Sequence, residues 1–188
     1  MKHASLAAFV ALLLLPTVAS ADDTVPDVGD IHVGVAGFAV GGDSDPASGA
    51  GMFADGEAGW RAGMFDFTGF AAYATHQVHA NFDSGNGMNN DVGDYRMHIL
   101  DLGVRATLRG KYAYGGVGVA FENELDDGTF KSGSAAPMPI QNNSDQHVAG
   151  ELRIGGVYQH VDVSASVMYG SAFGDSIVTA RLGVGYRF

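Results

Sequence analysis

Three side chains near the C-terminus are of the types that nucleophilic catalysis uses. His160, Asp162 and Ser164 alternate along the segment His160-Val161-Asp162-Val163-Ser164, and a serine nucleophile needs a histidine base that an acid holds in place. In an extended strand, however, alternate side chains lie about 7 Å apart, whereas a nucleophile needs its base within about 3 Å. The spacing alone therefore makes no catalytic triad, and we expect the chain not to be an enzyme.

Metal-ligating residue types also occur, but without the spacing that metal sites use. His76 and His79 fall on opposite faces of an extended strand, so they cannot share one metal without a bulge. Asp83, Asn86 and residues 89–91 offer oxygen atoms that calcium accepts, yet the ordered spacing of a calcium loop is missing. Cysteine is absent, which excludes thiolate zinc sites, cysteine nucleophiles and disulfides. We therefore predict no catalytic, metal or cofactor site.

The composition limits the partners and the fold class. The 188 residues include 10 Lys+Arg and 21 Asp+Glu, a formal charge of −11, which argues against binding the phosphate backbone of nucleic acids. A chain that is 46% hydrophobic and 16% charged is too apolar to be disordered. Its 28 glycines disfavour helices. The length suits a single domain.

The N-terminus has the pattern of an export signal. Lys2 precedes an unbroken run of ten apolar residues at 6–15, and the segment ends in the small residues Ala19-Ser20-Ala21. This pattern predicts a secretory signal peptide over residues 1–21, which leaves residues 22–188 as one mature domain. The alternative is a membrane anchor, but ten apolar residues are about half of what a spanning helix needs.

From residue 31 onward, apolar residues recur at every second position, as in strands. The clearest case is the last segment, where Val178, Ala180, Leu182, Val184, Tyr186 and Phe188 share one face. Eight segments alternate in this way, at 31–39, 52–62, 67–82, 100–109, 113–121, 148–158, 161–169 and 178–188. The facing of segment 67–82 stays open, because both of its faces are apolar over residues 70–73.

The connections between these segments alternate in length. Links are tight after the second, fourth and sixth segments, and longer and polar after the others, at 41–51, 83–94, 125–145 and 170–176. Tight turns at one end and long loops at the other are typical of a transmembrane β-barrel. The sequence therefore predicts an all-β fold, an eight-stranded antiparallel up-and-down barrel with short periplasmic turns and long extracellular loops.

The polar residues indicate which face points inward. If the apolar face meets lipid, the lumen holds a network of charges made by Asp55, Glu57, Arg61, Asp101, Arg105, Glu122, Glu151, Arg153, Asp162 and Arg181, with His32, Tyr112 and Tyr114 beside them. Inward glycines then leave room for these large side chains. Aromatic residues gather near the short-turn end of the apolar face, where a membrane girdle belongs: Trp60, Tyr158, Tyr186 and Phe188. The alternative, a soluble barrel with a dry interior, would place the charges in water.

The C-terminal run Leu182-Gly183-Val184-Gly185-Tyr186-Arg187-Phe188 resembles the closing strand of small Gram-negative outer-membrane proteins of the OmpX/Ail and OmpW kind, and the architecture is similar to the transmembrane domain of OmpA. The resemblance implies that Leu182, Val184, Tyr186 and Phe188 form the signal read by the barrel assembly machinery. It also implies export through the general secretory pathway, residence in the outer membrane as a monomer, and contact with membrane lipids and lipopolysaccharide.

We accordingly predict a structural, surface-interaction or envelope-stability role through the acidic extracellular loops. Acidic loops disfavour an adhesin that binds heparin or nucleic acid. Two alternatives remain. One is a narrow channel for small solutes or ions, and the other is a lipid-modifying enzyme of the outer membrane. For the enzyme, a lipid A deacylase pattern would require a His-x-Ser-Asn run, which the segment after His160 lacks.

Overall fold

The computed structural model describes residues 27–41, 47–83, 90–131, 138–139, 144–172 and 175–188. These residues form strands β1 (Val28–Gly41), β2 (Ala47–Ala62), β3 (Phe65–Asp83), β4 (Asn90–Arg109), β5 (Ala113–Lys131), β6 (Met138–Pro139), β7 (Ser144–Tyr158), β8 (Val161–Ala172) and β9 (Asp175–Arg187). No helix in these ranges is long and apolar enough to cross a membrane. The predicted signal peptide lies outside the described residues.

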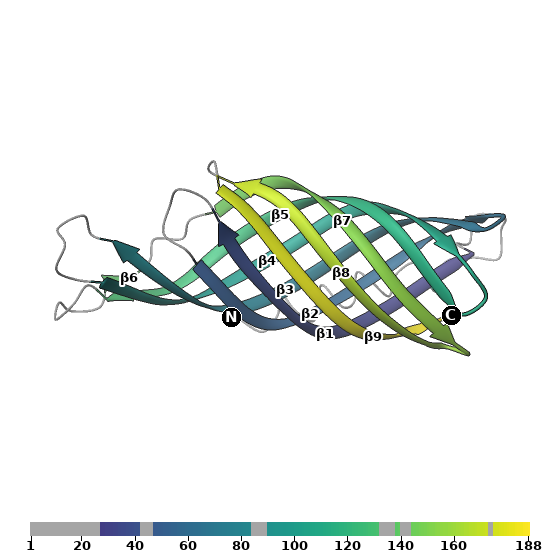
Figure 1. The fold of residues 1–188 in the computed structure, drawn as a ribbon, viewed down its shortest axis with the longest axis horizontal. Coiled ribbons are helices and arrows are strands. Elements are labelled where there is room, and N and C mark those ends of the chain that lie inside the picture. The colour runs from purple at the N-terminus through teal and green to yellow at the C-terminus, as the bar shows by residue number, and fades with distance from the viewer. Residues whose placement is uncertain (1–26, 42–46, 84–89, 132–137, 140–143, 173–174) are drawn as a thin grey trace, which may run out of the picture.

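Eight of the strands close into an antiparallel barrel (Figure 1). The strands pair with their neighbours in chain order, and β1 pairs with β9 to complete the ring. The prediction of an eight-stranded up-and-down barrel is confirmed. The two-residue β6 was not predicted; it pairs with Thr129 and Phe130, where β5 extends beyond the barrel.

The pairing register fixes how strongly the strands tilt. Each residue lies opposite one partner on the next strand, so these partners can be followed once around the barrel. Starting at Val28, the path passes through Gly59, Thr68, Arg105, Gly118, Glu151, Met168 and Thr179 and returns to β1 at Phe38. The circuit closes 38 − 28 = 10 residues further along β1. A stagger of this size gives eight strands the usual tilt of about 35–45° and an interior that side chains can fill.

The two ends of the barrel differ. At the turn end, residues 63–64, 110–112 and 159–160 connect consecutive strands, and the C-terminal Phe188 lies beside Gly29. Gly63 has a φ of +66° and Gln159 a φ of +55°. Two-residue hairpin turns need such positive φ angles to reverse the direction of the chain. Three longer connections, at residues 42–46, 84–89 and 132–143, join strands at the opposite end, the loop end. The predicted alternation of short and long connections holds for these three. The expected long loop at residues 170–176 is wrong, because β8 and β9 extend to Ala172 and Asp175 and leave only residues 173–174 between them.

Strands at the loop end run further than the sequence pattern indicated. Residues 90–94 and 125–131, which were expected in loops, belong to β4 and β5, and residues 92–94 pair with residues 129–131. The apolar alternation ends before the ladder does, because backbone hydrogen bonds need no apolar face once the strand enters water.

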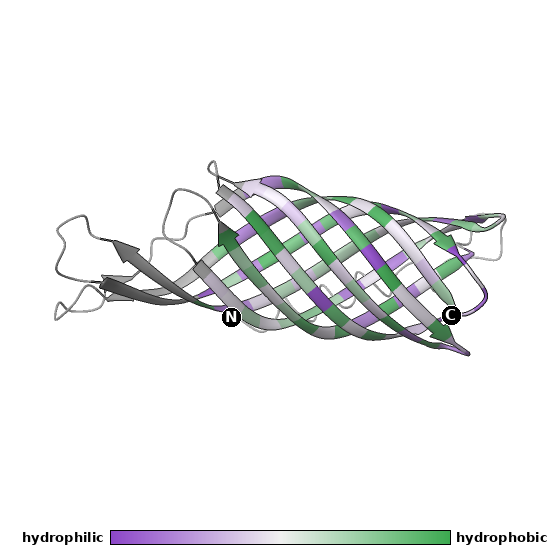
Figure 2. Ribbon diagram, in the orientation of Figure 1, coloured by the Kyte–Doolittle hydropathy of each residue, from purple (hydrophilic) through white to green (hydrophobic). Residues whose placement is uncertain are grey.

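Hydrophobic and hydrophilic residues alternate along the strands of the barrel (Figure 2), and large apolar side chains are exposed on its outer face. Exposed side chains on it include Val33, Val35, Met52, Phe67, Leu102, Val104, Val117, Val119, Leu152, Ile154, Val163, Leu182 and Val184. The structure settles the facing of β3. Phe70, Ala72, Ala74, His76 and Val78 point inward, and Phe65 and Phe67 point outward.

The inward face of β3 makes part of the lumen apolar. Ala36, Phe38, Phe53, Ala74, Val78, Met97 and Ile99 form one buried cluster, and Phe70, Ala72, Ala120, Ala149 and Met168 form another. Charges therefore do not fill the whole lumen. The expectation that Tyr112 faces the interior is wrong, since this residue lies at a turn and is exposed.

Candidate functional site

Arg105 is the centre of the charged groups in the lumen. From β4, its Nε donates to Glu151 Oε2 at 2.6 Å and its Nη2 to Glu151 Oε1 at 3.0 Å. Nη1 donates to Glu57 Oε2 at 2.8 Å, and Nη2 also reaches Asp55 Oδ2 at 3.3 Å. The guanidinium carbon lies 3.6 Å from the centre of the Phe70 ring. Arg105 thus ties β4 to β2 and β7 across the barrel, in the fork geometry that arginine suits.

A second arginine continues the contacts toward the turn end. Arg153 Nη1 donates to the same Glu57 oxygen at 2.9 Å, and its Nη2 lies beside the His32 ring. His32 donates from Nδ1 to Asp55 at 2.8 Å, and its Nε2 is 3.3 Å from Asp162. Each of these buried groups has an oppositely charged neighbour, as buried charges require.

Asp162 and Asp30 complete this network at the turn end. The Tyr114 hydroxyl donates to Asp162 Oδ1 at 2.7 Å, and Arg187 donates to Asp162 Oδ2 at 2.8 Å. Arg187 also donates to both carboxylate oxygens of Asp30. At the mouth itself, Asp66 binds two arginines that are less buried, Arg61 and Arg109.

These groups together form the turn-end network. Its members are Asp30, His32, Asp55, Glu57, Arg61, Asp66, Arg105, Arg109, Tyr114, Glu151, Arg153, Asp162 and Arg187. Six carboxylates meet five guanidiniums and the His32 imidazole. The charges balance when His32, which contacts Asp55 and Asp162, carries a proton.

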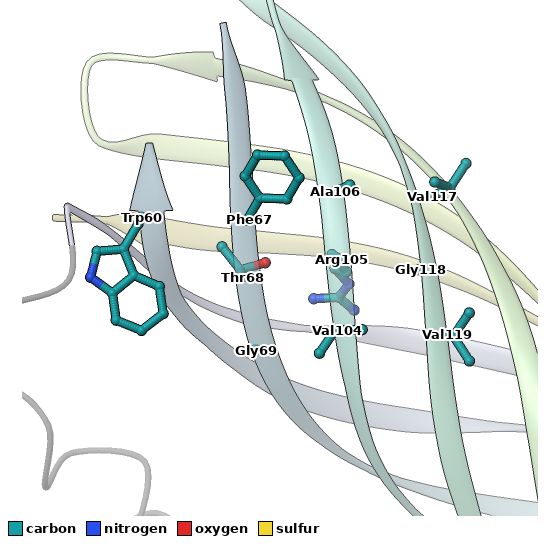
Figure 3. A pocket seen from close by; sticks show the side chains of 10 residues that line it. All are labelled: Trp60, Phe67, Thr68, Gly69, Val104, Arg105, Ala106, Val117, Gly118 and Val119. Carbon is teal, nitrogen blue, oxygen red and sulfur yellow. The ribbon is translucent and has the colours of Figure 1, made fainter. Parts of the chain in front are cut away.

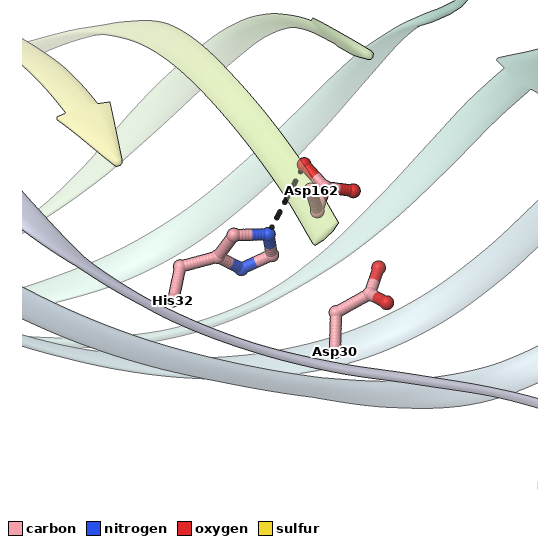
Figure 4. A group of neighbouring side chains, drawn as sticks. All are labelled: Asp30, His32 and Asp162. Carbon is pink, nitrogen blue, oxygen red and sulfur yellow. Dashed lines mark ion pairs between the residues drawn. The ribbon is translucent and has the colours of Figure 1, made fainter. Parts of the chain in front are cut away.

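Asp30, His32 and Asp162 also have the residue types of a metal site (Figure 4). One potential ligand atom from each lies within 4.8 Å of the others, and the Asp55 contact to Nδ1 resembles the carboxylate that orients a metal-bound histidine. Arg187, however, already bonds to both carboxylates, and Arg153 lies against the imidazole. With positive charge in place, the arrangement fits an ion-pair network better than a cation site.

Nearer the loop end, the described residues include a second group of buried charged side chains. Arg181 bonds to Asp101, and His147 Nε2 lies 2.7 Å from Glu122 Oε2 and 3.9 Å from Glu124 Oε1. All five side chains are buried. The Arg181 guanidinium carbon lies 5.7 Å from the ring centroid of Phe53, which belongs to the apolar cluster around Phe38 and Met97.

A hollow on the outer face contains no reactive constellation (Figure 3). Its lining includes Trp60, Phe67, Val104, Val117 and Val119, arranged around Gly69. The lack of a side chain at Gly69 opens space between aromatic and branched neighbours. Because the lining of this hollow and the surface around it are apolar, the hollow suits contact with the hydrocarbon chains of lipids.

The residue types considered for catalysis do not come together. Asp162 is held by Tyr114 and Arg187, whereas His160 is exposed, donates to the Arg187 carbonyl at 2.9 Å and stacks on Tyr186. Ser164 points into the lumen. His76 is buried there too. The side chains of His79, Asp83, Asn86 and residues 89–91 lie outside the described part of the chain.

The predicted lumen residues face inward, but they do not form a single network. Asp55, Glu57, Arg105, Glu151, Arg153 and Asp162 meet near the turn end, Arg61 lies at the mouth with its side chain 44% exposed, and Asp101, Glu122 and Arg181 lie apart from them. The proposed girdle and closing-strand residues, Trp60, Tyr158, Leu182, Val184, Tyr186 and Phe188, are exposed on the outer face.

Sequence reasoning missed several members of these groups. Asp30, Asp66, Arg109, Arg187, Glu124 and His147 were not among the predicted lumen charges. Asp30, Asp66 and His147 each lie one residue before a segment that was recognised by its apolar alternation. Glu124 lies three residues after such a segment, and Arg109 and Arg187 lie on the polar face inside one. In each segment every second residue points inward. Extending this alternation to the adjoining turn or loop would have identified these residues as lumen-facing.

Comparison with known proteins supports the fold. No protein-family model and no curated protein sequence matches the chain. Among solved structures, Ail of Yersinia pestis aligns with a TM-score of 0.61 at 16% identity, over 86% of this chain and 98% of Ail. OprG of Pseudomonas aeruginosa gives 0.54 at 16% identity, over 86% and 95%. Neisserial surface protein A gives 0.52 at 11% identity, over 85% and 95%. The chain thus has the fold of small eight-stranded outer-membrane barrels.

Proposed function

We propose that the protein spans the bacterial outer membrane as a sealed barrel, with its turn end in the periplasm, and acts at the cell surface through its acidic loops. The apolar outer face supports this placement, because in water such a large exposed apolar surface would drive association. Aromatic side chains are exposed close to the turns, where a membrane interface would hold them: Trp60, Phe65, Tyr112, Tyr158 and Phe188.

The packed lumen is the observation that carries the proposal of a sealed barrel. Asp30, His32, Ala72, Ala74, Asp101, Ala149 and Asp162 have no solvent-exposed surface, although all point into the barrel. Arg105 and Arg153 bridge opposite walls in the same region. A water-filled pore would expose these groups, so a stabilising or surface-interaction role fits better than bulk transport.

The loop end supplies the surface for interaction. Its connections and the adjoining strand ends hold Asp43, Asp45, Asp83, Asp91, Asp94, Asp126, Asp127, Asp145 and Asp175 against Arg96 and Lys131. Ail has been crystallised with the heparin analogue sucrose octasulfate, but a polyanion would be repelled by this set of charges. We expect cationic groups instead, or lipopolysaccharide phosphates bridged by divalent ions.

Export and assembly complete the proposal. Residues 1–21 would direct secretion, and Leu182, Val184, Tyr186 and Phe188 would present the closing strand to the barrel assembly machinery. A monomer suffices, because the sheet has no free edge along β1 or β9. No catalytic step is part of the proposal, and lipid A should remain unchanged when the protein is overproduced.

Planar-bilayer recording tests the sealed lumen. The purified protein should give no steady ion-selective openings. Openings that occur in the wild type and change in Arg105→Ala or Glu151→Ala would instead establish the narrow channel and contradict the proposal.

A further inference from the structure

The hollow on the outer face lies in the turn-end half of the barrel. Trp60, Phe67, Ala106 and Val117 are direct partners in one row across β2, β3, β4 and β5, close to the turns at 63–64 and 110–112. Figure 3 shows the aromatic rings of Trp60 and Phe67 on neighbouring strands. The hollow has a volume of about 500 Å³, which is within the range of roughly 300–1,000 Å³ usual for small-molecule sites.

Gly69 leaves this space open. A Cβ atom placed at this position would meet no heavy atom of another strand closer than 4.0 Å, where the carbonyl oxygen of Gly103 lies. Phe67 on the same strand is 51% exposed, and Val104, the direct partner of Gly69 on β4, is 64% exposed. Side chains around an unfilled gap lose dispersion contacts. On a face that meets lipid, a hydrocarbon chain is the group that restores these contacts.

The side chains around the hollow select an apolar occupant. Those of Trp60, Phe67 and Val104 are exposed, as are those of Val117 and Val119 on β5. The polar residues that also border the hollow, Thr68 and Arg105, are buried, and Arg105 bonds to Glu151 in the lumen. The headgroup of a lipid whose chain occupies the hollow must therefore lie outside it.

The neighbouring turns provide a place for that headgroup. The turns at 63–64 and 110–112 contain Lys111 and no carboxylate. The Lys111 ammonium lies 4.9 Å from the centre of the Tyr112 ring, and this ring is exposed. Along β4, residues 106 and 111 are separated by about 17 Å of extended chain, which is comparable to half of the hydrocarbon core of about 30 Å. A phosphate at Lys111 and an acyl chain in the hollow can thus belong to one lipid.

We propose that the hollow binds one acyl chain of an anionic phospholipid in the periplasmic leaflet, whose headgroup phosphate contacts Lys111. The inference rests on the membrane-spanning placement proposed above and adds a defined lipid site to it. Charge assigns the leaflet, because an anionic headgroup is attracted by Lys111 at the turn end and repelled by the aspartates of the loop end.

Trp60 is the only tryptophan of the chain and borders the hollow, so its fluorescence reports the occupant. The purified, delipidated protein in detergent micelles is titrated with phosphatidylglycerol that carries bromine atoms, which quench tryptophan, on its acyl chains. Quenching of the wild type should saturate at one lipid per chain. Gly69→Ile fills the hollow and should abolish the saturable step. Gly37→Ile adds the same side chain to the outer face of β1, where a Cβ atom has no contact closer than 3.5 Å, and should behave as the wild type does.

A matched pair of lysines tests the headgroup contact. Lys111→Gln should weaken binding of the brominated lipid about fivefold, the effect expected of one basic residue near an anionic membrane surface. Lys131→Gln, at the loop end of β5, should leave the affinity unchanged. Equal affinities of these two variants would overturn the contact of the phosphate with Lys111.

Vesicles made of the brominated lipid separate this inference from the membrane placement itself. Quenching of Trp60 in vesicles, combined with no saturable step in micelles or with the same saturation in Gly69→Ile, would overturn the lipid site while the barrel still contacts lipid. Absence of quenching in the vesicles would contradict the membrane placement, and the lipid site with it.

Discussion

Arg187 and Asp30 join the last strand of the barrel to the first. The two residues are direct partners across the β1–β9 pair, and the guanidinium bonds to both oxygens of the fully buried carboxylate. The same guanidinium reaches Asp162 on β8. One side chain next to the C-terminus therefore fastens three strands where the barrel closes.

Replacement of Arg187 should weaken this closure. Arg187→Ala removes the guanidinium that bonds to both oxygens of the buried Asp30 and one of the partners of Asp162, and breaking a buried ion pair in this way costs about 3–5 kcal/mol. Urea unfolding in phospholipid vesicles would measure the loss, with the single Trp60 as fluorescent probe. Arg61→Ala is the matched control. Its partly exposed pair with Asp66 is expected to contribute about 1 kcal/mol or less, so equal losses in the two variants would refute the role of Arg187.

A glycine on β7 makes room for Tyr114. A Cβ atom at Gly155 would lie 2.3 Å from Tyr114 Cζ, so Gly155→Ala should displace the ring and break its bond to Asp162. The overpacking is expected to cost about 1–3 kcal/mol in the same unfolding assay. Gly150 lies on the same strand with open space around its Cβ position, and Gly150→Ala should be neutral. A neutral Gly155→Ala would show that Tyr114 is free to move aside.

Sequence reasoning identified the outer face well and the lumen only in part. Lipid-facing positions such as Val117 and Leu152 belong to long runs of alternation that each strand displays by itself. The partners of Arg105 come from residues 46 and 48 positions away, and no local pattern reveals such pairs. On β3, Phe70 and Ala72 face other lumen side chains, so apolar residues occur on both faces of the strand. The alternation of apolar and polar residues therefore could not predict which face of β3 points inward.

The outer face should tolerate charge according to depth. Leu152 lies near the middle of β7 on the exposed apolar face, and Leu152→Arg should destabilise the barrel in vesicles by about 2–4 kcal/mol. Gln146→Arg, on the same strand near the loop end, should cost about 0–1 kcal/mol. Equal stabilities of the two variants would mean that the apolar face does not contact lipid.

The terminal aromatic should matter for assembly in cells. Phe188 is exposed and lies against Gly29, so Phe188→Ala removes little buried structure. If the closing strand carries an assembly signal, the amount of folded Phe188→Ala in the outer membrane should fall several-fold while the purified variant still refolds in detergent. Normal amounts in the membrane would reduce Phe188 to an interfacial aromatic.

Electrophoresis of the outer-membrane fraction, with and without boiling, tests the membrane-spanning barrel most directly. Closed barrels with buried ion networks resist detergent until heated, so the protein should appear in this fraction at two mobilities, a compact unboiled form and a slower boiled form. A single mobility, together with recovery of the protein in the soluble fraction, would contradict the account.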